Sequence, residues 1–102
     1  MQAQVLKEIK IKLPVAVADA FPERDIIKLM LDISLNKTDF YGSRCKQFEA
    51  LSKGSFAAVS KRIQKKKRED FKGWDDLLVW EGYEIGREEW ARKYRELKRC
   101  LK

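Results

Sequence analysis

The stretch Trp80–Leu101, WEGYEIGREEWARKYRELKRCL, decides the fold, because its large apolar side chains keep the spacing of a helix. Successive members of this seam stand 3, 7, 4, 3 and 4 positions apart: Trp80, Tyr83, Trp90, Tyr94, Leu97 and Leu101. Such steps place side chains on one side of an α-helix. The sequence therefore predicts one long amphipathic helix over residues 74–101, regular from about Asp76 to Cys100.

This aromatic seam has two compatible interpretations. One is that it covers the protein's own small core. The other is that part of it binds a partner, because Trp and Tyr are enriched among the residues that dominate binding energy, and a helix near a chain end can lie in a partner's groove. The candidate partner-binding residues are Trp80, Tyr83, Trp90, Tyr94 and Leu97.

Two glycines, Gly82 and Gly86, stand four positions apart inside this helix. Each lowers helix stability by about 1 kcal/mol relative to Ala, which indicates a packing purpose. The charged residues around them argue against a membrane helix, where such pairs bring helices together. In water, the pair predicts the close approach of another helix or an aromatic ring.

Upstream of the seam, helical patterns recur. Pro22, followed by Glu23 and Asp25, suits the first turn of a helix whose apolar residues continue to Leu35. This helix is apolar over most of its circumference, which is typical of packing on two sides. We expect it to end at Asn36–Lys37.

Two further helices are expected before the last one. Thr38 or Asp39 can cap the first of them, which Gly54 ends, and Ser55 can cap the second. The second directs Phe56, Val59 and Ile63 inward. Phe71 and Gly73 then predict a break, after which Asp75 caps the long C-terminal helix.

The N-terminal segment has a different period. In Val5–Leu13, VLKEIKIKL, apolar and charged residues alternate, which predicts a half-buried β-strand that ends at Pro14. No second alternating run is evident, and a lone strand leaves its backbone edges unpaired. We therefore expect this strand to pair with another copy or another chain, which makes the protein a homo-oligomer.

The composition excludes most classes of enzyme. The chain has 102 residues, 23 Lys and Arg against 16 Asp and Glu, a formal net charge of +7, and no His. It therefore has no imidazole base, no imidazole metal ligand and no Ser–His or Cys–His pair. Cys45, which we expect in the core, and Cys100 provide neither a four-ligand zinc site nor a disulfide framework. We expect a binding protein without catalytic residues, metal or cofactor.

No apolar run is long enough to span a membrane, and no cleavable signal pattern is present. We therefore expect a reduced, cytoplasmic protein. A basic run, KRIQKKKR, covers residues 61–68 and predicts either a solvated surface or contact with phosphates. The candidate nucleic-acid-binding residues are Lys61, Arg62, Lys65, Lys66, Lys67 and Arg68.

Two stretches together resemble a loosely defined group of short archaeal proteins regarded as antitoxin components of toxin–antitoxin gene pairs. They are Asp39–Val59, DFYGSRCKQFEALSKGSFAAV, and Phe71–Leu97, FKGWDDLLVWEGYEIGREEWARKYREL. The residues at the group's motif positions are Phe40, Tyr41, Arg44, Cys45, Phe48 and Glu49, then Gly54, Ser55 and Phe56, then Trp80, Tyr83, Trp90, Tyr94 and Leu97. The turn departs from the group's pattern, because Gly54 and Ser55 are adjacent where the group has a residue between them. The resemblance implies a non-enzymatic protein that neutralises a small toxin, such as a PIN-domain ribonuclease, and represses its own operon.

Together these observations predict a single, mainly α domain over residues 1–102. A strand segment at residues 1–14 is followed by about four helices, the last over residues 74–101. The favoured function is an antitoxin that occludes a protein toxin through its helical aromatic surface. The alternatives are a small basic protein that binds DNA or RNA, and a structural dimerisation module.

Overall fold

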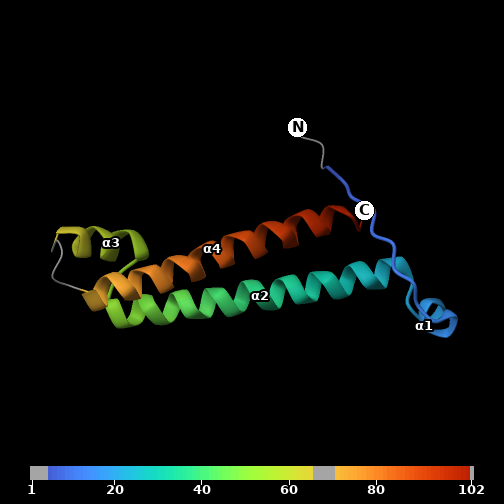
Figure 1. The fold of residues 1–102 in the computed structure, drawn as a ribbon, viewed down its shortest axis with the longest axis horizontal. Helices are drawn as coiled ribbons and strands as arrows, with labels where there is room; N and C mark the ends of the chain where they lie inside the picture. Colours follow the sequence, from blue (N-terminus) through green and yellow to red (C-terminus); the bar gives the residue numbers. More distant parts are fainter. Residues whose placement is uncertain (1–4, 66–70, 102) are drawn as a thin grey trace.

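The computed structural model describes residues 5–65 and 71–101. Within them it contains four α-helices, α1 (Val15–Ala20), α2 (Glu23–Ser52), α3 (Phe56–Lys65) and α4 (Phe71–Arg99), and no strand. The helices α2 and α4 run antiparallel as a long hairpin, with α3 beside one end and the N-terminal segment beside the other (Figure 1). The expectation of a mainly α protein is confirmed.

The hairpin is elongated. The molecule measures 61 × 33 × 20 Å and its radius of gyration is 19.4 Å, whereas a compact domain of this length has about 13 Å. We call the end that carries α3 the closed end, and the end where α2 begins and α4 finishes the open end.

The expected N-terminal strand is not present. Residues 5–14 form neither helix nor strand, because the described chain offers no second strand whose backbone could pair with them. The extended segment does finish at Pro14, as expected. Pro14 is the N-cap residue of α1, and its carbonyl oxygen accepts hydrogen bonds from the amides of Val17 and Ala18, both at 3.0 Å.

The expected division at Asn36–Lys37 is wrong, because α2 runs unbroken from Glu23 to Ser52. Thr38 does not cap a new helix. Its hydroxyl instead donates to the carbonyl oxygen of Ser34, one turn earlier, at 2.8 Å. The weak helix preference of such residues costs at most about 0.7 kcal/mol each, which packing along α4 outweighs.

The end of α2 lies next to Gly54, where it was expected. Lys53, and not Gly54, adopts the left-handed backbone conformation, with φ 55°. Gly54 follows, and its amide donates to the carbonyl oxygen of Glu49 at 3.2 Å. The predicted cap of α3 is confirmed, because the amide of Ala58 donates to the Ser55 hydroxyl at 3.2 Å.

The long C-terminal helix begins earlier than expected. It starts at Phe71 and continues through Gly73 and Asp75, so the expected break and the expected cap are both wrong. One glycine costs a helix about 1 kcal/mol, and the packing of Leu77 and Trp80 on the same helix against the other core residues offsets that cost.

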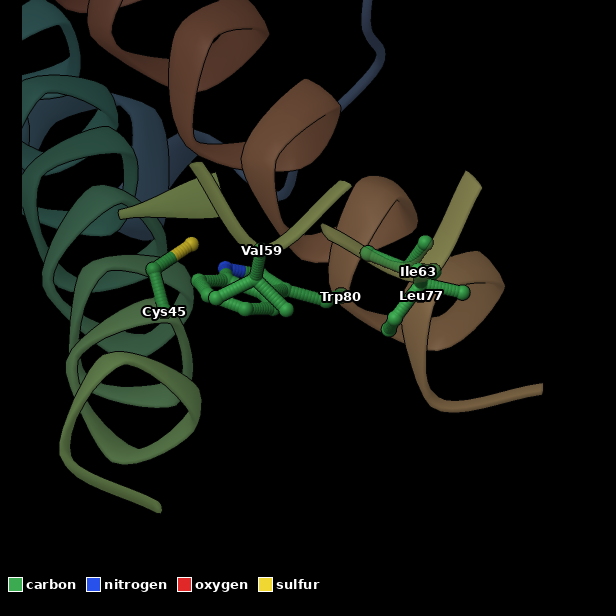
Figure 2. Packing of buried hydrophobic residues seen from close by; sticks show 5 residues of the cluster. All are labelled: Cys45, Val59, Ile63, Leu77 and Trp80. Carbon is green, nitrogen blue, oxygen red and sulfur yellow. The ribbon is translucent and has the colours of Figure 1, made fainter. Parts of the chain in front are cut away.

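The hydrophobic core lies at the closed end, where three helices meet. Its buried residues are Cys45 of α2, Val59 and Ile63 of α3, and Leu77 and Trp80 of α4. Figure 2 shows these five residues gathered in one cluster, with Cys45 and Val59 near the Trp80 ring and Ile63 near Leu77. The inward positions expected for Val59 and Ile63 are confirmed, and so is a buried Cys45.

Candidate protein-binding site

The structure divides the aromatic seam into two parts with different surroundings. Trp80 is 1% exposed, and its ring stacks on Phe48 and meets Phe56 edge-on, both at 5.4 Å between ring centroids. Tyr83 is half-buried and packs near Phe48 and Tyr41, each at 6.1 Å between centroids. In this chain Trp80 and Tyr83 therefore belong to the core.

The rest of the seam lies toward the open end. Trp90, Tyr94 and Leu97 are half-buried. Lysines lie over two of the rings, with the Lys93 ammonium 4.4 Å from the centroid of Trp90 and the Lys98 ammonium 5.3 Å from that of Tyr94. These positions are favourable for cation–π attraction, and they leave part of each ring accessible.

A cavity of about 480 Å³ opens beside this part of the seam. Its walls come from three parts of the chain: Val5, Leu6 and Lys7 of the N-terminal segment, Met30, Ile33 and Ser34 of α2, and Trp90, Lys93, Glu96, Leu97 and Cys100 of α4. Most of these side chains are apolar, and Lys7, Lys93 and Glu96 add charge. A cavity of this size with an apolar lining and a few charged groups suits a binding site.

The sequence interpretation missed the contribution of α2 to this cavity. Met30 is 40% exposed and Ile33 is 54% exposed. The pattern of α2 had predicted packing on two sides, and α4 is the helix that packs extensively along it. The apolar surface of α2 is broader than α4 alone can cover. This width was the signal in the sequence that Met30 and Ile33 remain accessible.

The N-terminal segment borders the cavity without burying its own apolar side chains. The exposed fraction is 100% for Val5, 76% for Leu6, 67% for Ile9 and 68% for Ile11. Val5, Ile9 and Ile11 are three of the four alternating apolar positions, and the fourth, Leu13, is 46% exposed. The prediction that the segment pairs with another chain stays a prediction, and the segment is accessible for such pairing.

The candidate nucleic-acid-binding residues that the structure describes lie at the opposite end of the molecule. Lys61, Arg62 and Lys65 are exposed on α3, whereas Lys66, Lys67 and Arg68 lie outside the described residues. Arg62 has a structural role, because its guanidinium donates to the carbonyl oxygen of Ser52 at 3.0 Å and so completes the last turn of α2.

The environment of Cys45 makes it chemically inert at neutral pH. Burial raises the pKa of its thiol to about 11, with a smaller contribution from the hydrogen bond and negative charge of Glu84. The nucleophilic species of cysteine is the thiolate, and a pKa this high keeps the thiol protonated. Cys45 therefore acts as a small core residue, whereas Cys100 is exposed beside the cavity.

Two further properties concern the part of the chain that the structure describes. None of its helices is long and apolar enough to cross a membrane. No group of three or more potential metal-ligating side chains occurs in it. Comparison of the chain with protein-family models, curated proteins and solved structures gives no match.

Proposed function

We propose that the protein is a non-enzymatic antitoxin that binds a protein toxin at the open end of the hairpin. The observation that carries this proposal is the apolar cavity beside Trp90 and Leu97, together with the exposed N-terminal segment that borders it. The resemblance of the two sequence stretches to antitoxin components supplies the class of partner, a small ribonuclease-like toxin. A reducing, cytoplasmic setting fits two cysteines that are both free.

The cavity supplies anchors of the kind that dominate protein interfaces. Trp90 and Leu97 present apolar surface from α4, and Met30 and Ile33 present it from α2. Accessible aromatic side chains surrounded by apolar and charged groups commonly carry most of the energy of an interface. A side chain of the toxin that enters the cavity would cover these residues and exclude water from them.

The N-terminal segment supplies a second kind of contact. Residues 5–13 have no backbone partner strand in the described chain, and their apolar side chains are exposed. An extended segment of this type can add a strand to the edge of a partner's sheet, with the main chain giving affinity and alternate side chains giving specificity. The proposal therefore unites the segment and the cavity in a single interface.

The experiment that tests this function is co-expression of the chain with the product of the adjacent gene. Trp90→Ala should weaken binding by on the order of 2 kcal/mol, about thirtyfold, and should relieve suppression of toxicity. Trp74→Ala is the matched control, because it removes the same ring from the closed end of α4, where Trp74 is 37% exposed.

Circular dichroism of both variants must show folded protein before their activities are compared. Binding and toxicity that respond equally to Trp74→Ala and Trp90→Ala would contradict the proposed site. An adjacent gene product that is neither toxic nor bound by the wild-type chain would contradict the antitoxin function itself.

A second candidate function, contact with DNA or RNA, is favoured by the position of α3. Its buried side holds Val59 and Ile63, so Lys61 and Lys65 lie exposed at the closed end of a chain with net charge +7. If they contact phosphates, changing both to Gln should lower affinity and reduce the salt dependence by about two phosphate contacts. An unchanged salt dependence would identify these lysines as a solvated surface.

A further inference from the structure

Two rows of side chains run along α2, and each row repeats with alternating steps of four and three residues. The inner row consists of Ser34, Thr38, Tyr41, Cys45, Phe48 and Ser52. Each of its members is buried or half-buried. Tyr41 lies against Gly86, and Phe48 stacks on Trp80. The inner row is therefore the side of α2 that packs on α4.

The outer row has the same steps, displaced by one residue toward the N-terminus. It consists of Ile33, Lys37, Phe40, Arg44, Gln47 and Leu51. All six residues are exposed, and the exposed fraction is 54% for Ile33, 47% for Phe40 and 82% for Leu51. A displacement of one residue turns the row by about 100° around the helix axis. The outer row therefore lies beside the contact with α4 and faces solvent.

The period of the outer row determines what kind of neighbour fits it. Alternating steps of three and four residues are the spacing at which one helix contacts another along its length. A β-strand presents its side chains with a period of two, so it would not stay in register with this row. The outer row extends over about 27 Å, the length of a helix of about 18 residues. Its period and its length both suit a helix.

Shallow cavities follow the outer row from one end to the other. At the closed end, a cavity of about 170 Å³ lies between Leu51 of the row and Val79 and Tyr83 of α4. In the middle, a cavity of about 330 Å³ borders Phe40 and Ile33. At the open end, Ile33 also borders the cavity of about 480 Å³ described above. The outer row and the adjacent side of α4 thus form a groove along the hairpin.

The helix α3 leaves this groove open, because it lies on the other side of the hairpin. Its buried residues Val59 and Ile63 pack with Leu77, whereas Val79 borders the groove. Leu77 and Val79 stand about 160° apart around the axis of α4. A helix in the groove would therefore leave the core at the closed end unchanged.

The charge of the groove indicates the chemistry of its partner. Among the described residues, the charged side chains that line its three cavities are those of Lys7, Lys37, Arg44, Lys93 and Glu96. Four of these five are cations, and no carboxylate belongs to the outer row. A partner with complementary charge carries carboxylates beside its apolar residues.

The two cations of the outer row are available to such a partner. The Arg44 guanidinium lies 5.3 Å from the centroid of the Phe40 ring and donates to the side-chain oxygen of Gln47 at 3.4 Å. Both contacts stay within the row and leave further guanidinium donors for carboxylates. Within the described residues, neither Arg44 nor Lys37 forms an ion pair.

We propose that the outer row of α2 binds an acidic amphipathic helix of the toxin, which completes a three-helix bundle with α2 and α4. This inference rests on the proposed antitoxin function and names the element of the toxin that the groove covers. Apolar side chains of that helix cover Ile33, Phe40 and Leu51, and its carboxylates pair with Lys37 and Arg44. The toxin-binding surface then extends from the cavity at the open end to the turn at the closed end.

The test measures the affinity of the full chain for the product of the adjacent gene over a range of salt concentrations. The double variant Lys37→Glu/Arg44→Glu should weaken binding at least about tenfold, because it places like charges opposite the carboxylates of the toxin helix. Salt should weaken the wild-type complex by screening these pairs, and the double variant should lose that dependence.

Lys28→Glu/Lys46→Glu is the matched control. Both lysines are exposed on the same helix, and they lie about 170° away from Lys37 and Arg44 around its axis. The control makes the same change in net charge, so an effect confined to the outer row reports a direct contact. Circular dichroism of both double variants must show folded protein before their affinities are compared.

Leu51→Ala tests the apolar part of the groove. Because Leu51 is 82% exposed, its truncation leaves no cavity in the free protein and should not change the free energy of unfolding. In the complex, the lost contact should weaken binding about fivefold or more. Leu35→Ala is the matched control, since Leu35 is 42% exposed and lies about 160° away from Leu51 around the axis of α2.

Hydrogen exchange identifies the element of the toxin directly. Binding of the wild-type chain should protect a toxin helix that carries carboxylates beside a three-and-four repeat of apolar residues. Changing those carboxylates to Lys should restore the affinity for the Lys37→Glu/Arg44→Glu variant. Protection confined to strands or loops of the toxin would overturn the inference.

The antitoxin function and this inference fail in different ways. If Trp90→Ala weakens binding and the outer-row variants do not, the function stands and the inference is wrong. Equal effects of the outer-row variants and their controls would have the same meaning. Outer-row variants that retain the toxin but lose self-association in sedimentation would assign the row to a second copy of the chain. A wild-type chain that does not bind the adjacent gene product would overturn both.

Discussion

Trp80 at the closed end is 1% exposed, whereas Trp90, ten positions further along the same helix, is only half-buried. Both belong to one seam, and both are directed toward the region between α4 and α2. The difference is the third element, because α3 covers Trp80 with Val59 and Phe56, and no described helix does the same for Trp90. The aromatic seam is therefore part of the core only where a third helix covers its side chains.

The largest expected effect tests this comparison directly. Trp80→Ala should lower the free energy of unfolding by about 3 to 5 kcal/mol, because it leaves a cavity among residues from three helices. Trp90→Ala should cost clearly less in the protein without its toxin. Urea denaturation of the two variants measures both values. Equal losses would show that the open end is as fully packed as the closed end.

An intermediate effect concerns the buried thiol at the closed end. The pKa of Cys45 is raised by burial from 9.0 to about 11 in the folded protein, so the folded state binds more protons than the unfolded state in this window. Stability from this group is complete below pH 9 and is lost as the pH rises toward 11. The loss should be on the order of 2 kcal/mol.

Denaturation at a series of alkaline pH values measures this loss as the difference between wild type and Cys45→Ala. The comparison removes the contribution of other groups that titrate in the same range. Cys100→Ala controls for the removal of a thiol from an exposed position. A Cys45→Ala variant whose stability falls with pH as steeply as that of wild type would contradict the prediction.

The smallest effect concerns the turn at the closed end. Lys53 has φ 55°, a conformation that glycine adopts without the steric cost of a Cβ atom. Lys53→Gly should raise the free energy of unfolding by about 0.5 to 1 kcal/mol, after the greater entropy of glycine in the unfolded chain is subtracted. Lys46→Gly, in the regular part of α2, should lower it by about 1 kcal/mol. Changes of the same sign would contradict the role assigned to the turn.

The sequence predicted those features of the fold that depend on local geometry. The spacing from Trp80 to Leu97 predicted the long helix, Ser55 was identified as the cap of α3, and Val59 and Ile63 were placed inward. Each follows from the period of a helix or from a backbone amide that needs an acceptor. The same reasoning found Cys45 in the core but did not single out Leu77, although it lies three positions before Trp80.

Features that depend on long-range contacts were not predictable in this way. Thr38 is a good helix cap by residue type, yet its hydroxyl bonds within a continuous helix because α4 packs along α2. The N-terminal alternation is a genuine strand pattern without a partner strand in the described chain. The candidate site was only partly predicted for the same reason, since the division between Trp80 and Trp90 depends on where α3 lies.

The turn at the closed end also determines the order in which the hairpin assembles. Contacts there join residues close in sequence, such as Ser52 and Arg62, whereas the cavity at the open end brings together residues as distant as Met30 and Leu97. Loop closure costs more entropy as the connecting chain lengthens. Contacts between α2 and α4 therefore form first near the turn and then progressively toward the open end. The cavity is therefore the last part to form and the first to fray. A partner that binds the cavity would stabilise the paired form of the open end by mass action.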